Sequence, residues 1–316
     1  SQTEVVFDGG SLVMDAGGQL IKEGKYFQED FIIADLDQVK KEGSGHEPVA
    51  VRTFDKDMRV SRASDPDTIV QYLIAEKNIR EIYLALVLGV RDYFSKMGFT
   101  KAILGSSGGI DSAVTLALAC DALGKENVTA ILMPSQYSSD HSVSDAEQLS
   151  KNLGNPYQVI PIKDVYESFL TALKPTFKDL PFSVAEENIQ SRTRGNLLMA
   201  IANKFGYILL NTSNKSELST GYGTLYGDMA GGLSVLGDVY KIQVYALARY
   251  INKEKEIIPV NIIDKEPSAE LRPNQKDSDS LPEYNVLDKV LYQYIERRQS
   301  PKDIVAIGID EALVKR

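Results

Sequence analysis

The stretch KAILGSSGGIDS, residues 101–112, decides the fold of this chain. Its first five residues form an apolar run typical of a buried strand, and the segment DSAVTLALACDALG that follows is typical of a helix ended by Gly124. At such a junction the first N–H groups of the helix lack intrahelical partners and the helix dipole favours an anion, so phosphate oxygens can bind there. Asp111 would repel a phosphate unless a cation lay between them, which makes it a candidate Mg²⁺ ligand.

Strands and helices alternate regularly after this junction. The runs VTAILMP, YQVIPI and YILLN are typical of strands, and helical stretches separate them, including SVSDAEQLSKNLG, a segment from Asp164 and residues 186–205. This alternation predicts an α/β fold, a doubly wound parallel sheet of about five strands with helices on both faces. Upstream, apolar residues recur at helical spacing over residues 68–97, which predicts one long helix or two in tandem.

The first 66 residues have a different pattern. Between residues 4 and 33, three short apolar runs punctuated by Gly pairs predict successive strands, which should pair with a further segment or pack on the main domain. We therefore expect strands over residues 1–38, a linker over 39–66 with one strand at VAVRTF, and a main domain over 67–316. The polar stretch 272–284 is expected to be a mobile loop.

Composition argues against several classes of protein. A chain of 316 residues with 43% apolar residues can bury a large core, and its single cysteine, Cys120, allows no internal disulfide. A net charge of −9 disfavours a nucleic-acid partner, and no run approaches the roughly 18 to 20 apolar residues that span a membrane. These features predict a cytoplasmic, globular protein without nucleic-acid or membrane partners. Because the chain opens with Ser1, we expect a fragment of a longer chain.

The turn after the first central strand has the residue types that a phosphate loop needs. Gly108 and Gly109 let the backbone approach a ligand closely, and the hydroxyls of Ser107 and Ser112 add donors. An ordinary Asp or Ser N-cap after a Gly-rich turn is the alternative interpretation. The two commoner nucleotide-binding glycine patterns do not fit.

The run instead resembles the SGGxDS loop of the ATP pyrophosphatases, which include NAD, GMP and asparagine synthetases and RNA-thiolating enzymes. The resemblance implies that ATP loses pyrophosphate while AMP passes to the substrate. It assigns ATP binding to the loop residues Gly105, Ser106, Ser107, Gly108, Gly109, Ile110, Asp111 and Ser112.

A second stretch, EENIQSRTRGNLLMAIAN at 186–203, narrows the choice within this superfamily. Asn188 and Arg192 are four positions apart on a predicted helix and so project from one face. The stretch resembles the NAD synthetases, and the resemblance implies that both side chains contact deamido-NAD. A solvated, polar helix start is the alternative interpretation.

A third stretch, LLNTSNKSELSTGYGTLYGDMAGG at 209–232, leaves the end of a predicted strand, where ligands bind in doubly wound folds. Its resemblance to the same family implies that Thr212 contacts ATP and that Glu217 lies beside the substrate and shares Mg²⁺ with Asp111. Leu225 stands where the shorter, ammonia-dependent members have a Lys, which points to the larger, glutamine-dependent branch. The residues expected to line the substrate pocket, with packing as their alternative role, are Tyr222, Thr224, Tyr226 and Asp228.

A fourth stretch, GDVYKIQVYALARYI at 237–251, begins a predicted helix at Lys241. Lys241 matches a family lysine near the ATP phosphates, and an ammonium suits the charge that develops on a leaving pyrophosphate; a surface lysine is the alternative. We therefore expect Asp111, Glu217 and Lys241 to be catalytic. Residues 267–288 resemble the family's mobile segment near the active site, which is expected to order on ligand binding and to exclude water.

Together these stretches resemble the glutamine-dependent NAD synthetases over residues 70–315. The resemblance implies a ligase with an adenine nucleotide alpha-hydrolase-like fold. It would adenylate the nicotinate carboxylate of deamido-NAD with ATP and Mg²⁺, and amidate it with ammonia to give NAD, AMP and pyrophosphate.

The same resemblance implies partners. Residues 1–38 would be the remnant of an upstream, nitrilase-like glutaminase domain that supplies ammonia, and the helices of residues 68–97 would form the face of a homodimer or higher homo-oligomer. Cys120 lies inside an apolar helix and is expected to be inert core rather than a glutaminase nucleophile. Three alternatives stay open: a GMP-synthetase-like or RNA-modifying ATP pyrophosphatase, a nucleotide-binding module without activity, and a purely structural fragment.

Overall fold

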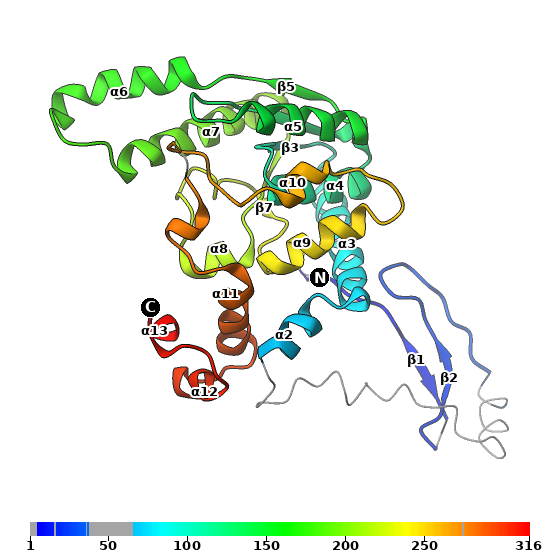
Figure 1. Ribbon diagram of the computed structural model, residues 1–316. Helices are drawn as coiled ribbons and strands as arrows, with labels where there is room; N and C mark the ends of the chain where they lie inside the picture. Colours follow the sequence, from blue (N-terminus) through cyan, green and yellow to red (C-terminus); the bar gives the residue numbers. More distant parts are fainter. Residues whose placement is uncertain (1–4, 16, 36, 38–65, 274) are drawn as a thin grey trace.

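A computed structural model of the chain describes residues 5–15, 17–35, 37, 66–273 and 275–316 (Figure 1). The predicted linker over residues 39–66, with its strand at VAVRTF, therefore lies outside the described residues except for Pro66. The division into three parts stays a prediction.

A parallel sheet of five strands forms the centre of the main body, in the order β5-β4-β3-β6-β7. Its strands are β3 (Ala102–Gly105), β4 (Val128–Leu132), β5 (Tyr157–Val159), β6 (Ile208–Asn211) and β7 (Leu233–Ser234). The chain moves outward from β3 in one direction and then returns to build the other half of the sheet, so the doubly wound topology is confirmed. The switch point lies between β3 and β6, the position where such sheets bind ligands.

Both faces of the sheet are covered, because alternate side chains of each strand point to opposite sides. From β3, Ala102 and Leu104 pack with the helices of one face, whereas Ile103 packs on the other face against Leu198 and Ala202 of α7. The near-continuous apolar runs in β3 and β4 follow from this burial on two sides.

Helices form over all the segments where they were predicted, and shorter helices that were not predicted lie at 215–220, at 260–264 and beyond residue 283. The stretch 68–97 forms two helices in tandem, and the polar stretch 272–284 contains one short 3-10 helix, η3 (Asp277–Asp279). The α-helices are α2 (Pro66–Leu73), α3 (Glu76–Met97), α4 (Ile110–Leu123), α5 (Asp140–Leu153), α6 (Lys163–Phe177), α7 (Val184–Phe205), α8 (Lys215–Thr220), α9 (Lys241–Ile251), α10 (Val260–Asp264), α11 (Tyr284–Leu291), α12 (Pro301–Ala306) and α13 (Glu311–Lys315). A further 3-10 helix, η2 (Lys125–Asn127), precedes β4, and a π-helical turn, η4 (Tyr292–Glu296), follows α11.

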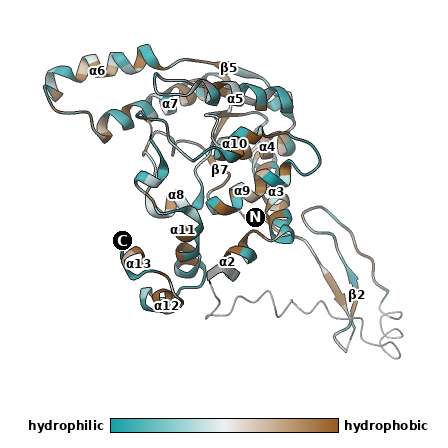
Figure 2. Cartoon of the chain, viewed as in Figure 1, coloured by the Kyte–Doolittle hydropathy of each residue, from teal (hydrophilic) through white to brown (hydrophobic). Residues whose placement is uncertain are grey.

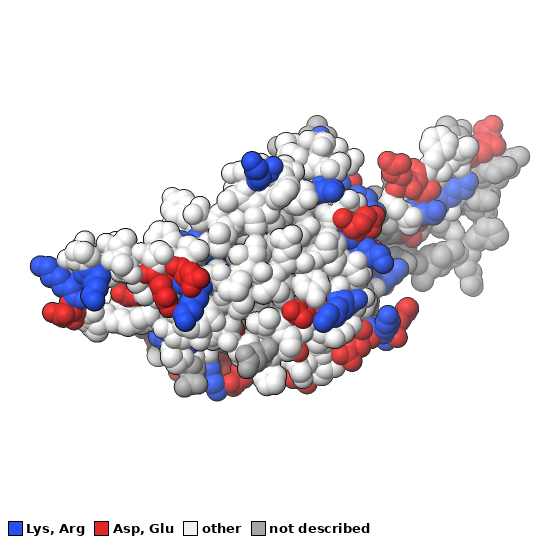
Figure 3. Space-filling view, turned by 90° about the horizontal axis from the view of Figure 1, so that it is seen from above, with Lys and Arg blue, Asp and Glu red and all other residues white. Residues whose placement is uncertain are grey.

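Helix burial differs with position in the fold. Nearly all of α4 is buried, since it lies between the sheet and α3 and α9, whereas α6 has one buried residue, Tyr166, and mixes hydrophilic and hydrophobic residues along its length (Figure 2). In the view from above, Lys and Arg are interspersed with Asp and Glu around a largely uncharged centre (Figure 3). Within the described ranges, no helix has both the length and the apolar character needed to cross a membrane.

The N-terminal segment forms a two-stranded antiparallel hairpin, β1 (Leu12–Met14) with β2 (Leu20–Glu23), which projects from the main body (Figure 1). Both β1 and β2 lie within the second of the three expected runs, so the strands expected at VVFDGG and FIIADL are wrong for the described residues; the first run makes only an isolated bridge, Gly9 to Tyr26. Phe31 and Ile33 are 83% and 72% exposed, and the Ile33 carbonyl accepts a hydrogen bond from the Lys22 ammonium instead of a strand N–H.

Candidate active site

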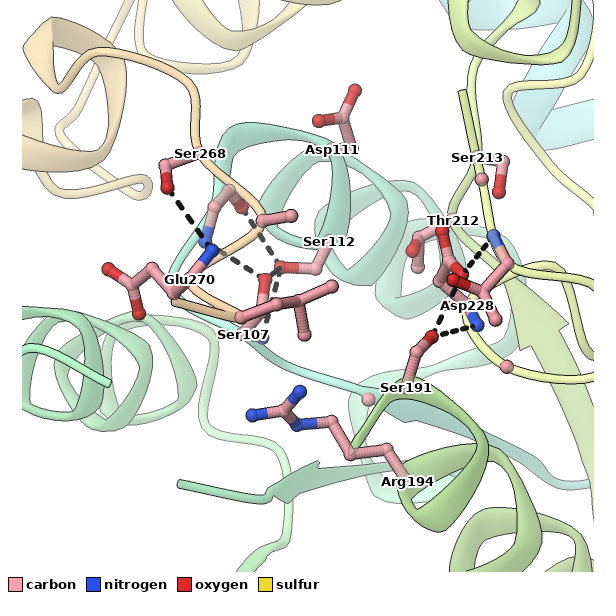
Figure 4. Close-up of a pocket in the computed structure, with 18 of the residues that line it drawn as sticks. Ser107, Asp111, Ser112, Ser191, Arg194, Thr212, Ser213, Asp228, Ser268 and Glu270 are labelled. Atoms are coloured by element: carbon pink, nitrogen blue, oxygen red, sulfur yellow. Dashed lines mark hydrogen bonds between the residues drawn. The ribbon is translucent and has the colours of Figure 1, made fainter. Parts of the chain in front are cut away.

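A cavity of about 470 Å³ opens at the carboxyl ends of β3, β4 and β6 (Figure 4). Its walls come from the N-terminus of α4, from α7, from residues 221–230 and from residues 265–277. This size suits a nucleotide-sized ligand. The predicted site residues that line it are Gly105 to Ser112, Asn188, Thr212, Glu217, Tyr222, Thr224, Asp228 and Lys241, whereas Tyr226 is exposed and does not line it.

The turn between β3 and α4 is shaped by close backbone contact with α5. Gly108 has φ +78°, and a β-carbon there would lie 2.3 Å from the Ser142 carbonyl oxygen. Only glycine fits both the conformation and the space. Ser112 Oγ donates to the Gly109 carbonyl at 2.9 Å and lies 3.2 Å from Ser107 Oγ, so these two hydroxyls share one side of the turn.

Lys241 is shared by two carboxylates beside this turn. Its Nζ donates to Asp111 Oδ2 at 2.6 Å and to Glu217 Oε1 at 3.0 Å, and the side chain is only 2% exposed. Sequence positions more than a hundred residues apart thus meet at one ammonium. The three residues expected to be catalytic form one cluster.

Asn214 orients both acids of this cluster. Its Nδ2 donates to Asp111 Oδ1 at 2.8 Å, and its Oδ1 accepts the Glu217 backbone N–H at 3.0 Å. Asn214 is the N-cap of α8, and the Glu217 carboxylate in turn accepts the Asn214 backbone N–H. Asn214 was not predicted as a site residue, although the capping-box pattern N-x-x-E marks it in the sequence.

Burial governs the electrostatics of the cluster. Loss of solvation and the negative charge of Asp111 raise the pKa of Glu217 above its ordinary value, and Lys241 opposes this. Burial alone would lower the pKa of Lys241, but the charges of Asp111 and Glu217 outweigh it and raise that pKa. Lys241 therefore stays an ammonium at neutral pH.

The donor chemistry of the cluster fits a magnesium ion bound together with a phosphate ligand. Asp111 and Glu217 supply two hard carboxylate oxygens that converge on one cation position. The described part of the chain contains no group of three or more His, Cys, Asp or Glu residues that could enclose a metal. Two carboxylates suit Mg²⁺, which usually keeps waters and phosphate oxygens as its other ligands.

The opposite wall is built from α7 and the irregular segment 221–230. Thr224 Oγ1 donates to Asn188 Oδ1 at 2.7 Å, and Asp228 Oδ1 accepts from the Thr224 N–H at 2.7 Å and from Ser191 Oγ at 2.9 Å. Figure 4 shows Ser191 and Asp228 facing each other across this wall. Arg192 is exposed and is not among the residues that line the cavity; its Nε donates to the Leu225 carbonyl at 3.1 Å.

Arg194 reaches into the cavity and was assigned no role from the sequence (Figure 4). Its Nε donates to the Met133 carbonyl at 3.1 Å, at the end of β4. Burial lowers the pKa of Arg194 to about 10, against the opposing charges of Glu270 and Asp228, so the guanidinium remains a cation. Two positions along a helix turn a side chain by roughly 200°, so Arg192 and Arg194 face opposite ways.

Residues 265–277 cover the cavity above the phosphate loop. Lys265 Nζ pairs with Glu270 Oε1 at 2.5 Å and contacts Ser142 Oγ, which also donates to Glu270 Oε1 at 2.8 Å. Further along, Asp277 is 4% exposed and accepts from the hydroxyls of Tyr222 and Tyr284. The segment is thus pinned at two points, neither of which was predicted.

Comparisons with known proteins identify the family of the chain. The family model for NAD synthase matches residues 82–316. Glutamine-dependent NAD(+) synthetases from Synechocystis sp. and Thermotoga maritima are 49% and 45% identical over 98% and 99% of this chain, which covers 52% and 56% of theirs. The chain therefore spans about half the length of the curated relatives it matches.

Two solved structures are similar as well. The glutamine-dependent NAD+ synthetase from Acinetobacter baumannii in complex with ADP is 40% identical, with a TM-score of 0.69 over 98% of this chain and 52% of that one. The NMN synthetase from Francisella tularensis is 30% identical, with a TM-score of 0.63 over 72% of this chain and 90% of that one.

Proposed function

The chain belongs to the NAD synthase family, and from this premise we propose that it activates the nicotinate carboxylate of deamido-NAD with ATP and replaces it with an amide. The observation that carries the proposal is the meeting of the glycine turn at 105–112 with the Asp111–Lys241–Glu217 cluster in one cavity. The glycine turn can bind a triphosphate, and the cluster can compensate the negative charge that moves onto pyrophosphate when the triphosphate is cleaved.

The proposed ATP site uses the turn before α4. The orphan N–H groups of the helix and the hydroxyls of Ser107 and Ser112 bind phosphate oxygens, and Thr212 lies on the same cavity wall at the end of β6. Arg194 adds a cation on the opposite wall. Asn188, Tyr222, Thr224 and Asp228 lie toward the substrate side of the cavity.

The first step is the attack of a nicotinate carboxylate oxygen on the α-phosphorus. The bond from that phosphorus to the bridging oxygen of the β-phosphate breaks, so an acyl adenylate forms and pyrophosphate leaves with the bond's electron pair. Lys241 stabilises the negative charge that collects on the pyrophosphate. Asp111 and Glu217 would hold Mg²⁺, which neutralises phosphate charge when bound.

In the second step ammonia attacks the activated carbonyl carbon, AMP leaves, and one proton is released from nitrogen. The acyl adenylate must be kept from water during this time, because hydrolysis would return the acid. The segment 265–277 covers the cavity and is placed to do this.

The partners follow from the same proposal. The longer relatives are named for glutamine, and we propose that a glutaminase domain upstream of this chain supplies the ammonia. A homo-oligomer through α2 and α3 and a cytoplasmic location stay predictions.

The deciding experiment mixes the chain with ATP, Mg²⁺ and deamido-NAD, with either ammonium or glutamine as the nitrogen source. We expect equal amounts of AMP and NAD with ammonium and none with glutamine. The Asp111→Asn variant is the matched control and should lose AMP formation. Formation of ADP in place of AMP would overturn the reaction assignment.

The likeness to an NMN synthetase favours a second candidate acceptor, the deamido form of NMN. The two acceptors share the nicotinate carboxylate and differ in the adenylate half. Parallel titrations of AMP formation with both acceptors distinguish them, because the preferred one gives the higher kcat/KM.

A further inference from the structure

Asp288, on α11, is a fully buried carboxylate that the proposed chemistry does not use. Its Oδ1 accepts a hydrogen bond from Ser216 Oγ at 2.5 Å, and its Oδ2 accepts one from the Ile242 backbone N–H at 2.9 Å. Both donors are neutral groups. A buried carboxylate held in this way is costly compared with an apolar residue, which indicates that the position serves more than packing.

The two donors are the direct neighbours of two cluster residues. Ser216 precedes Glu217 in α8, and Ile242 follows Lys241 in α9. Ser216 Oγ, while it donates to Asp288, also accepts the Lys241 backbone N–H at 2.9 Å. One carboxylate therefore ties together the two short elements that carry the acid and the lysine.

The contacts satisfy backbone N–H groups at the buried start of α9. The first N–H groups of α9 have no partners within the helix, and the N-cap residue Tyr240 offers no side-chain hydrogen bond to them. Ser216 Oγ accepts the first of these N–H groups, that of Lys241, and Asp288 Oδ2 accepts the second, that of Ile242. A negative charge at this end is also favoured by the helix dipole.

We propose that Asp288 is a positioning residue, which sets the place of Lys241 between Asp111 and Glu217 by holding the start of α9 against α8. Lysine is a long, flexible side chain, so its ammonium reaches a given point only if its backbone is fixed. A misplacement of about 1 Å at a reacting group costs on the order of a hundredfold in rate.

Helix α11 also connects this clamp to the covering segment. Its first residue, Tyr284, donates to Asp277 Oδ2 at 2.9 Å, and its ring centroid lies 5.1 Å from Lys241 Nζ. The first residue of the helix that carries Asp288 is thus hydrogen-bonded to the last residue of the segment that covers the cavity. Helix α11 therefore contacts both the backbone N–H of Ile242, next to Lys241, and the Lys241 ammonium.

The kinetic test uses Asp288→Asn, which keeps the shape of the side chain but can accept from only one of the two donors. It rests on the proposed function, so wild-type AMP formation with ammonium is measured first. We expect kcat to fall about tenfold or more while KM for ATP stays within about twofold, since the phosphate loop is untouched. Ser216→Ala should show the same split.

Two further variants separate positioning from general destabilisation. Leu287→Ala, at a buried apolar neighbour on α11, should lower the melting temperature without the kcat loss. In a Lys241→Met background, Asp288→Asn should cause no further fall in the residual rate, because it acts through the lysine that is gone. Equal kcat losses in Leu287→Ala and Asp288→Asn, or additive losses in the double variant, would overturn the proposal.

A crystal structure of Asp288→Asn tests the inference without turnover. The expected result is a displaced start of α9 and a Lys241 Nζ that no longer contacts both acids. If Lys241 kept both contacts, the positioning role would be refuted, whereas failure of the wild type to release AMP would count against the proposed function alone.

Discussion

Gly108→Ala and Gly109→Ala are neighbouring substitutions that should have very different effects on stability. A β-carbon at Gly108 would lie 2.3 Å from the Ser142 carbonyl oxygen and 2.8 Å from its Cα, and the backbone there has φ +78°. At Gly109 φ is −94°, and the nearest new contact is the movable Ser107 Oγ at 3.2 Å. At Gly108 an added β-carbon would meet fixed backbone, in a conformation that alanine disfavours. At Gly109 neither problem arises.

The magnitudes follow from these contacts. The left-handed conformation costs an alanine about 1 to 2 kcal/mol. Overpacking against backbone that cannot turn away costs about 1 to 3 kcal/mol more. We therefore expect Gly108→Ala to lower the free energy of unfolding by about 3 kcal/mol, whereas Gly109→Ala should stay within about 1 kcal/mol of wild type.

Urea unfolding followed by far-ultraviolet circular dichroism measures both variants, and this signal suits a chain with no Trp. The ATP-dependent rise in melting temperature is recorded in parallel, because Gly108→Ala can relieve its clash only by moving the phosphate loop. Equal urea midpoints for wild type and Gly108→Ala would refute the packing of this turn against α5. A destabilised Gly108→Ala variant with an unchanged ATP response would show that the tight turn is not needed to bind phosphate.

Three further predictions concern the cluster, the cavity wall and the buried acid. Lys241→Met should slow pyrophosphate release about a hundredfold in a coupled assay with little change in KM for ATP, and a change confined to KM would contradict its role in charge stabilisation. Arg194→Gln should raise the ATP concentration for half-maximal thermal stabilisation about tenfold, whereas Arg192→Gln, outside the cavity, should leave that ATP response unchanged. Burial raises the pKa of Asp288 from 3.8 to about 6. The folded chain therefore binds this proton more tightly than the unfolded chain, which adds about 3 kcal/mol to the free energy of unfolding below about pH 4. This stabilisation is lost as the pH rises to about 6. The free energy of unfolding of wild type minus that of Asp288→Asn should therefore fall between pH 4 and 7, and a pH-independent difference would count against the burial of this carboxylate.

The parts of the fold that could be predicted are those with local causes. The alternation of apolar runs with helical segments predicted β3, β4, β5 and β6, whereas β7 (Leu233–Ser234), which is only two residues long, was not predicted. The pattern of apolar residues and glycines gave a wrong prediction at Phe31–Asp35, where an alternating apolar run forms no strand. Whether such a run pairs depends on a partner strand elsewhere, which its own residues do not encode.

The candidate site divides in the same way. The residues of the phosphate loop could be predicted because one turn holds both the glycines and the helix start. Which of Arg192 and Arg194 points into the cavity depends on how α7 is rotated against the sheet. The sequence does not show this rotation, because both arginines lie in the same polar part of the helix. Asp288 gave no signal at all, since its partner Ser216 lies 72 positions away.

The charge arrangement in the cavity gives a physical reason for a divalent ion in the proposed reaction. Lys241 is shared by Asp111 and Glu217, and Lys265 is paired with Glu270, so both ammonium groups already have carboxylate partners. A triphosphate gains little from a cation that is already neutralised, and it meets repulsion from the acids beside it. Mg²⁺ held by Asp111 and Glu217 would neutralise the negative charge of those acids. The Lys241 ammonium could then attract the phosphates. Chelation of divalent ions should therefore weaken nucleotide binding itself as well as turnover, and the ATP-dependent rise in melting temperature measures this directly.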